Sequence, residues 1–501
     1  MYRFLAAVAL CAAILAGASP AFCAELYEDS KTGQIFSKPG DGRVAVQLPA
    51  ERVSGLYTDA NGNVYAKPGD GRTALAVSEA APVAAVPAPK SMTKEEVLAL
   101  LPEWQQRLKM SGDLRLRYQW EKKEFAGNPT VPPTTTNAAL AERQRAKLRA
   151  RIEVAADVVK SVKAYVGLAS TMNDTTGGLD GRSTNYTFGA FNEHPIIALD
   201  YAYADYNAFN GVNILGGVMK NPFYTVSQLT WDVDTRPQGG AVKINEPVNS
   251  RMNLLMNGGV FVLNELNGPQ IDVKHAVAGG GYNSGHVSPW MYELQAGLDT
   301  KPCKNVSFKA MLNYYGYQNL KGLVKTTVSS SGATSSNTAI VVGGANYYKY
   351  AYNAVGTAGE LGYDNLISGK VNYAGVFGEY IHNPGAPQDN NGTILGLVIG
   401  DRKVKNRGDW QYLVDWRRLE KDCEPDFMSE SDFLNGATNV QGTHMTATYG
   451  LYKNFALSLN WYHAAQISDR VITYSVTGVP TSARVARPNF NLLEADVLFT
   501  F

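Results

Sequence analysis

The stretch ERQRAKLRARIEVA, residues 142–155, carries a cation at every second position. The cations are Arg143, Arg145, Lys147, Arg149 and Arg151, and small, apolar or amide side chains lie between them. A helix would spread these charges around its circumference, because neighbouring side chains differ there by about 100°. A strand places all five on one face. The stretch therefore predicts a β-strand with one positive face in water and one apolar face.

The composition excludes several classes of protein. The chain has 501 residues, with 46 Lys plus Arg against 45 Asp plus Glu. This balance argues against a nucleic-acid partner. The mean hydropathy of −0.20 does not fit a protein with many membrane-spanning helices.

The N-terminus predicts an exported protein. Residues 1–24 combine Arg3, an apolar run and small residues, which is typical of a cleaved secretory signal peptide. Cleavage after Cys23 and cleavage after Ala24 both fit. No uncharged apolar run of 18 or more residues follows, so we expect no spanning helix in the mature chain.

Residues 25–77 contain a tandem repeat. LYEDSKTGQIFSKPGDGRVAV recurs as LYTDANGNVYAKPGDGRTALAV, with KPGDGR units that begin at Lys38 and Lys67. Each copy predicts a small hairpin, and both a periplasmic docking module and a loosely ordered tail fit the pattern. Residues 78–108 predict an Ala/Pro linker and a short helix, opened by a Thr93–Glu96 capping box and limited by Pro102.

From residue 109 to residue 501 the chain predicts an all-β fold, a transmembrane antiparallel β-barrel of about 16 strands. Its segments alternate apolar with polar or small residues, and short turns alternate with long polar loops. An even number of strands with both chain ends at the short-turn side is typical of an outer-membrane barrel. Lipid requires the apolar outer face, and closure satisfies every backbone group. The predicted strands are 112–120, 142–155, 163–172, 196–206, 212–220, 239–245, 253–265, 290–299, 306–317, 366–373, 375–383, 393–401, 410–420, 442–451, 455–464 and 490–501.

The last residues form an apolar stripe with a period of two, which ends on an aromatic residue. The stripe consists of Leu493, Ala495, Val497, Phe499 and Phe501. It resembles the C-terminal signal that the outer-membrane assembly machinery reads, which makes this machinery a predicted partner.

Several segments resemble the "putative porin" family of bacterial outer-membrane proteins, which are sixteen-stranded barrels. These segments are SGDLRLRYQW (111–120), RQRAKLRARIEVA (143–155), GGVMKNPF (216–223), TWDVDTRPQGGAV (230–242) and residues 416–462. The resemblance implies passive diffusion of small solutes or ions across the cell outer membrane, with lipid and lipopolysaccharide around the barrel. It names no solute. A homotrimer is one assembly to test.

The candidate functional site is a basic ladder on the polar face of the first two strands. Arg115 and Arg117 join the five cations of residues 142–155. Rows of charge in a narrow lumen set ion selectivity, so the ladder predicts a preference for anions. The third long loop, 222–237, is expected to fold inward, so that Asp232 and Asp234 face the ladder across a constriction. In the alternative, wall acids such as Glu153 and Asp200 neutralise the ladder locally.

No pattern predicts catalysis, a metal site or a cofactor. The histidines are isolated, without metal-ligand spacing, at His194, His275, His286, His382, His444 and His463. The acidic residues 420–432 could bind a divalent cation, but a solvated loop near lipopolysaccharide is the preferred interpretation. Cys303 and Cys423 are expected to stay unpaired. Besides a porin, a structural anchor that tethers the envelope through residues 25–108 remains a second hypothesis.

Overall fold

The computed structural model describes residues 26–29, 35–36, 43–46, 57–58, 64–65, 69–71, 73–74, 102–125, 142–171, 181–189, 191–266, 274–276, 282–284, 288–327, 336–434, 436–468, 470–475, 480–484 and 488–501. The chain divides into two compact units, residues 1–97 and 98–501. The predicted signal peptide and the Thr93–Glu96 capping box lie outside the described residues.

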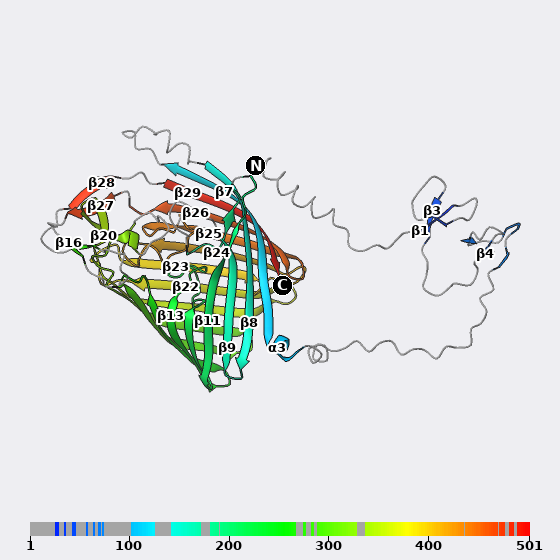
Figure 1. Cartoon of the computed structure of the whole chain (residues 1–501), viewed down its shortest axis with the longest axis horizontal. Helices are drawn as coiled ribbons and strands as arrows, with labels where there is room; N and C mark the ends of the chain where they lie inside the picture. Colours follow the sequence, from blue (N-terminus) through cyan, green and yellow to red (C-terminus); the bar gives the residue numbers. More distant parts are fainter. Residues whose placement is uncertain are drawn as a thin grey trace. The chain divides into compact units, whose positions relative to one another are not determined.

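The second unit is a closed antiparallel barrel of sixteen strands, which confirms the predicted fold (Figure 1). Each strand pairs with the next along the chain, and the last pairs with the first. The barrel strands are β7 (Leu108–Phe125), β8 (Glu142–Val159), β9 (Val162–Thr171), β11 (Ile196–Phe209), β12 (Val212–Val218), β13 (Gln238–Asn249), β14 (Met252–Val262), β17 (Trp290–Cys303), β18 (Val306–Gln318), β21 (Tyr352–Ile367), β22 (Val371–His382), β23 (Asn391–Gly400), β24 (Trp410–Leu419), β25 (Val440–Tyr452), β26 (Phe455–Gln466) and β29 (Pro488–Thr500).

The final residue takes part in the closure. The backbone N–H of Phe501 donates to the carbonyl of Gly112 at 3.1 Å, and the N–H of Gly112 donates back at 3.0 Å. The pairing of β29 with β7 continues from Thr500 to Pro488. A closed ladder leaves no unpaired edge for lipid to solvate, which is the physical condition for a sheet in hydrocarbon.

The tenth predicted strand is misplaced, although the count of sixteen is correct. Residues 366–373 span the turn between β21 and β22, and β21 itself begins at Tyr352. The sequence of β21, YNAVGTAGELGYDNLI, contains three glycines and lacks a continuous apolar alternation. Its strand character comes from pairing with β18 and β22 on both sides, which the local sequence does not reveal.

The two ends of the barrel differ in their connections. The turn end holds short turns such as 160–161 and 210–211, where Gly211 adopts φ +78°, a left-handed conformation that glycine reaches without strain. The loop end holds the long connections. Among their described parts are β10 (Tyr186–Thr187), the hairpin of β15 (Lys274–Ala276) and β16 (Tyr282–Ser284), η1 (Lys325–Thr327), and a sheet of β19 (Ala339–Val342), β20 (Ala345–Tyr348), β27 (Arg470–Ser475) and β28 (Pro480–Arg484). We use the names turn end and loop end below.

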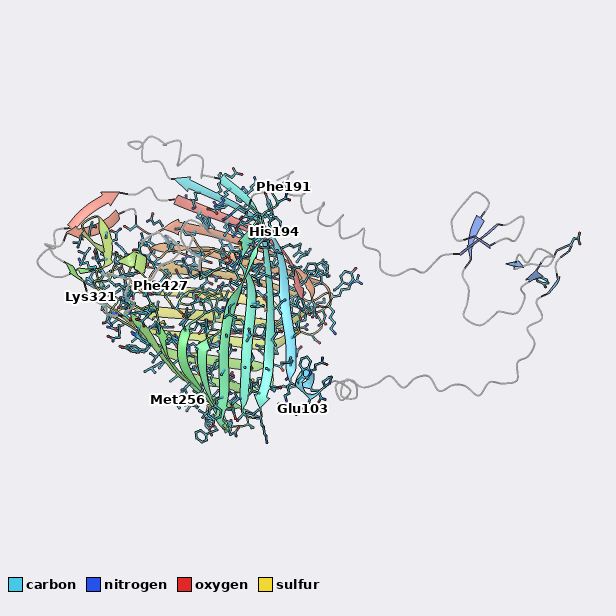
Figure 2. All side chains as sticks on the ribbon, viewed as in Figure 1. Glu103, Phe191, His194, Met256, Lys321 and Phe427 are labelled. Atoms are coloured by element: carbon cyan, nitrogen blue, oxygen red, sulfur yellow. The ribbon has the colours of Figure 1, made fainter. Side chains whose placement is uncertain are left out.

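Figure 2 shows the side chains that cover the strands of the barrel, and the exposure of neighbouring residues in β7 alternates between its two faces. Leu116 on the outer face is 42% exposed, whereas Arg117 on the inner face is 6% exposed. The inner face is not polar throughout, which corrects the expectation that it meets water everywhere. Phe261, Met291 and Tyr315 point inward and pack in a buried apolar cluster.

In the first unit, each repeat copy forms a three-stranded antiparallel sheet rather than a simple hairpin. The first sheet contains β1 (Leu26–Asp29), β2 (Ile35–Phe36) and β3 (Arg43–Val46). The second contains β4 (Tyr57–Thr58), β5 (Val64–Tyr65) and β6 (Thr73–Ala74). The domain boundaries and the periplasmic role of this region remain predictions.

A short helix precedes the barrel. It is α3 (Glu103–Gln106), which begins directly after Pro102. Among the described residues, no helix is long and apolar enough to cross a membrane.

Candidate functional site in the barrel lumen

Three segments from the loop end fold into the lumen and bind one another. They are residues 181–185, 219–237 and 420–439. The N–H of Asp232 donates to the carbonyl of Met428 at 3.0 Å. The guanidinium of Arg182 donates to the carbonyls of Ser429 and Gly436, both at 3.0 Å. These bonds make one internal body from segments far apart in the sequence.

The position of residues 420–432 corrects the prediction of a solvated acidic loop. Asp422, Glu424 and Asp426 are each only 1% exposed. The lumen supplies partners for them, since Lys325 pairs with Asp426 at 2.9 Å and the N–H of Thr338 donates to Asp422 at 2.8 Å. Buried charge is tolerated where it is paired and hydrogen-bonded.

Residues 181–185 enter the lumen because of a break in the wall. β9 ends at Thr171, and β10 later takes up the free edge of β8, pairing with Lys147 and Leu148. Residues 181–185, the described part of the connection, precede β10 and form no strand. The Thr184 hydroxyl donates to Asp234 at 3.3 Å, which connects this segment to the second inward segment.

The seven predicted cations all lie on the inward face, but most of them form ion pairs with acidic residues. Arg117 binds Asp496 at 2.7 Å, Asp432 at 3.2 Å and also Glu494. Arg117 and Lys147 are buried, so the middle of the ladder is covered instead of open to water. The charges are placed as predicted, and their surroundings are not.

The outer parts of the ladder have acid partners too. Arg145 pairs with Glu121 at 3.0 Å, while Arg149 and Arg151 pair with Asp113 at 2.8 and 2.7 Å. Arg115 lies 3.9 Å from Asp496 and donates to Asn185 at 2.6 Å.

Two cations of the ladder differ from the rest. Among the residues that the structure describes, no ion pair is found for Arg143 or Lys147. Arg143 is exposed, near the loop end of β8. The sequence also allowed Glu153 and Asp200 to neutralise the ladder. In the structure these two acids pair with cations outside the ladder, Glu153 with Lys220 and Asp200 with Arg236.

The two predicted constriction acids lie in different surroundings. Asp234 reaches the end of the ladder, where it pairs with Arg151 at 3.2 Å. Asp232 is 2% exposed and accepts the backbone N–H groups of Ser431 and Asp234 at 2.7 and 2.8 Å. The acid that meets the middle of the ladder is Asp432, from the third inward segment.

The electrostatics of the two loop acids differ accordingly. Burial raises the pKa of Asp232 to about 8, although two backbone N–H donors favour its charged form. Burial also opposes the charge on Asp432, but the cations Arg117, Lys147 and Arg115 outweigh it and lower the pKa of Asp432. Asp432 therefore acts as a fixed anion.

A β-bulge in β11 turns Asp200 into the lumen. The pairing with β9 shifts between Leu199 and Tyr201, so that Asp200 is an extra residue and the ring of Tyr201 lies opposite Gly167. A Cβ at Gly167 would overlap that ring. Bulges often redirect side chains beside functional sites, and here the bulge places two polar side chains on the same face.

Asp200 meets Arg236 from the second inward segment. Nη2 of Arg236 donates to one carboxylate oxygen of Asp200 at 3.0 Å, and Nε forms an ion-pair contact with the other at 3.0 Å without a hydrogen bond. Nη1 of Arg236 donates to the carbonyls of Val233 and Thr235 at 2.8 and 3.1 Å. We call Asp200 and Arg236 the junction pair.

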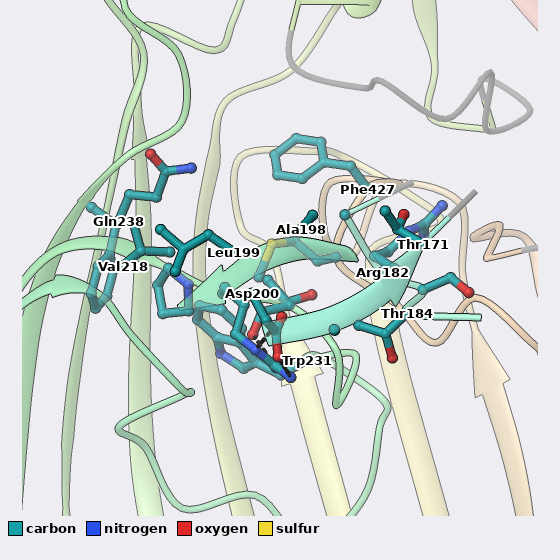
Figure 3. Close-up of a pocket in the computed structure, with 18 of the residues that line it drawn as sticks. Thr171, Arg182, Thr184, Ala198, Leu199, Asp200, Val218, Trp231, Gln238 and Phe427 are labelled. Atoms are coloured by element: carbon teal, nitrogen blue, oxygen red, sulfur yellow. Dashed lines mark hydrogen bonds and ion pairs between the residues drawn. The ribbon is translucent and has the colours of Figure 1, made fainter. Parts of the chain in front are cut away.

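Two cavities meet at the junction pair. The loop-side cavity has a volume of about 510 Å³ and is lined largely by apolar side chains, including Val218, Trp231 and Phe427 (Figure 3). The turn-side cavity has a volume of about 610 Å³. Asp200, Arg236 and Trp231 line both.

The wall behind Trp231 fixes its position. Its indole N–H donates to Glu293 at 2.9 Å, and its ring packs edge-on against Phe261 with centroids 6.5 Å apart. Ser227 donates to Glu379 at 2.7 Å on the neighbouring part of the wall. The second inward segment is therefore held from both sides, by the acids of the wall and by the ladder.

Sequence reasoning missed several of these residues. Arg236 was within reach, because it lies in the predicted constriction loop two residues after Asp234. Asp432 had no signal, since 315 positions separate it from Arg117. The remaining predicted residues fall as follows: Leu493, Ala495, Val497 and Phe499 share the outer face of β29, opposite the inward Glu494 and Asp496, and Cys303 and Cys423 are both free.

A closed antiparallel barrel with inward segments that narrow its lumen defines a channel of the porin class. The chain belongs to the family described as "Putative porin", whose model matches residues 90–349 and 356–485. It is accordingly an outer-membrane channel.

The chain is also similar to several solved structures. A mutant of the Rh. blastica porin is 9% identical, with 79% of this chain and 100% of that chain covered and a TM-score of 0.37. Acinetobacter baumannii OccAB3 is also 9% identical, with 78% and 100% covered and a TM-score of 0.36. None of the curated proteins compared with the chain matches it.

Proposed function

We propose that the barrel lets small hydrophilic solutes diffuse passively across the outer membrane, with a preference for anions. The observation that carries this preference is the excess of positive charge on the ladder. Acids pair with five of its seven cations, while Arg143 and Lys147 have no ion-pair partner among the described residues. Lys147 is buried and interacts with Asp432, so Arg143 is the exposed cation that would raise the local concentration of anions in a narrow lumen.

The preference is expected to be modest. A unit charge acts on an ion 4 Å away by about 1 kcal/mol in water, and salt reduces the effect further. Asp113, Glu121, Glu494 and Asp496 cancel most of the field of the ladder. The paired cations then keep the wall and the inward segments in place, and the exposed Arg143 contributes most of the bias in conduction.

The test is the reversal potential of the purified protein in planar bilayers under a KCl gradient. The double variant Arg143→Ser, Lys147→Ser should lower the chloride-over-potassium permeability ratio roughly twofold. Lys160→Ser is the matched control, because Lys160 is exposed in the turn between β8 and β9. An unchanged ratio in the double variant would exclude the ladder as the source of selectivity.

The apolar stripe of β29 is proposed to be the signal for the assembly machinery. Its exposure on the outer face and the closure of the barrel by Phe501 support this role. Phe501→Ser should reduce the amount of folded barrel in the outer membrane without changing synthesis, measured by fractionation. The same material, cross-linked in the membrane, would show whether the protein assembles as a homotrimer.

A second candidate function is an envelope anchor that acts through residues 25–108. It is supported by the two small sheets of the repeat region, which belong to a unit separate from the barrel unit. Deletion of residues 25–77 should weaken the envelope against detergent and leave single-channel conductance unchanged. Loss of conductance with an intact envelope would favour a role within the channel instead.

A further inference from the structure

We propose that the loop-side cavity binds small zwitterions that carry an apolar substituent, the chemical class of α-amino acids with aromatic or aliphatic side chains. The proposal rests on the proposed diffusion function and names a solute class for it. It is carried by two features that meet at one place, the junction pair and the apolar wall beside it.

The junction pair presents opposite charges side by side. The Asp200 side chain is 7% exposed and that of Arg236 is 11% exposed, so each needs an opposite charge beside it. Arg236 has a second, longer contact, because its Nη2 lies 3.8 Å from Asp234. The carbonyls of Val233 and Thr235 hold the guanidinium of Arg236 independently of Asp200. The bulge in β11 likewise fixes Asp200 from its own strand. The two groups are in contact at 3.0 Å, so a solute must part them, and each group has its own anchor when that happens.

The charge of the solute follows from this arrangement. A monoanion bound to Arg236 would take the paired cation away from the buried Asp200, and a monocation bound to Asp200 would leave Arg236 with only its longer contact to Asp234. Breaking a buried pair from one side is strongly unfavourable. A zwitterion offers a carboxylate to Arg236 and an ammonium to Asp200, so every charge stays paired and the planar guanidinium can bind the carboxylate with two hydrogen bonds.

The apolar substituent follows from the wall. Trp231, Phe261 and Met291 line the cavity on one side of the junction pair, and Phe427 and Met428 of the third inward segment line it as well. Transfer of an apolar group from water to such a surface is favourable. The volume of about 510 Å³ lies in the ordinary range of small-molecule sites. A zwitterion without a side chain would gain only the polar contacts.

The position of the site suits transport as well as binding. A solute that passes the junction pair reaches the turn-side cavity, which is lined by charged side chains such as Asp113, Arg151 and Lys220. Its apolar group then leaves Phe261, Met291 and Phe427, and its charged groups meet further charged partners there.

The test uses L-phenylalanine as the probe, with the full-length protein in planar bilayers. Phenylalanine should reduce the ion current in a saturable manner at a concentration at least tenfold lower than phenylacetate, phenethylammonium or glycine. These three lack the ammonium, the carboxylate and the apolar group, respectively. Equal block by phenylacetate and phenylalanine would overturn the proposal. This measurement uses only the wild-type protein, so it does not depend on the folding of any variant.

Variants locate the site. Asp200→Asn, Arg236→Gln and Trp231→Ala should each weaken the block by phenylalanine tenfold or more. The matched control is Asp364→Asn with Arg402→Gln, an Asp–Arg pair in the turn-end region whose Nε–Oδ1 distance is 2.8 Å, and it should leave the block unchanged. Unchanged block in the junction variants would overturn the proposal. Ion conductance without the probe reports separately on the diffusion function, so the two can fail independently.

Discussion

The loop-side and turn-side cavities share the junction pair and Trp231, yet they differ in how many charged residues line them. Only three residues that line the loop-side cavity are charged, namely Arg182, Asp200 and Arg236. Seven charged residues line the turn-side cavity, namely Asp113, Arg151, Glu153, Asp200, Lys220, Asp232 and Arg236. The two cavities are thus separated by one ion pair and differ in charge.

The two cavities differ because different residues of the wall and of the inward segments line them. The loop-side cavity takes Phe261 from β14 and Met291 from β17, inward positions that pack against segment 219–237. The turn-side cavity takes the end of the ladder and the acids beside it. An inward face can thus be polar where it meets water and apolar where it meets another part of the chain.

The largest effect on the difference between the two cavities is expected when segment 420–439, which lines the loop-side cavity, loses its ion pairs with the ladder. Arg117→Met would leave Asp432, Glu494 and Asp496 without their shared cation. Loss of one side of a buried pair costs about 3–5 kcal/mol. We expect a lower unfolding temperature in a gel-mobility assay and a larger single-channel conductance, because segment 420–439 loses its hold on the ladder.

The control for this substitution is Arg402→Met. Arg402 pairs with Asp364 where both side chains are partly exposed, at 44% and 35%. Such pairs contribute about 0–1 kcal/mol. An Arg117→Met protein as stable as the Arg402→Met protein would show that segment 420–439 is held by other contacts.

A smaller disturbance should reach the junction pair through the bulge. In Gly167→Ala the new methyl group overlaps the ring of Tyr201, the residue next to Asp200. Overpacking of this kind costs about 1–3 kcal/mol. We expect reduced conductance, together with weaker block by phenylalanine.

Gly216→Ala provides the comparison for this variant. No atom lies within 4 Å of a Cβ at Gly216. Its stability and conductance should match the wild type, since substitutions away from packed sites usually change stability by less than about 0.5 kcal/mol. Equal conductance in the two alanine variants would mean that Tyr201 moves aside without affecting Asp200.

The smallest expected effect is a change of ion preference with pH, caused by the charge of Asp232 in the turn-side cavity. Asp232 lines the turn-side cavity, and burial raises its pKa to about 8. It is mostly neutral below pH 8 and becomes a carboxylate above it, so a rise from pH 6.5 to pH 9 adds one negative charge to that cavity. The anion preference should fall across this interval, measured as the reversal potential, and Asp232→Asn should remove that step. A step of equal size in the asparagine variant would assign it to another group.

The barrel could be predicted where the alternation of residues within one strand shows which face is apolar and which is polar. The alternation in β8 places Arg143 to Arg151 inward because side chains in a strand have a period of two. The same rule failed in β21, where glycines at Gly356, Gly359 and Gly362 remove the apolar signal. There the two neighbouring strands supply the hydrogen bonds that make the strand.

The interior was predictable only in part. The acidic residues 420–432 look solvated by composition, because isolated carboxylates belong in water. Their burial requires partners such as Lys325, Thr338 and Arg417, which lie on other segments. Local sequence carries no information about these distant partners.

By itself, the sequence determined the number of strands, the closed sheet, the outer-membrane class and the inward direction of the basic ladder. Each of these depends on local periodicity and on the requirement that a sheet in lipid has no open edge. Only the tertiary structure decided which charges pair, which inward residues meet water, and where Asp200 meets Arg236. Those outcomes depend on contacts between segments far apart in the chain, and the period of a single strand does not specify them.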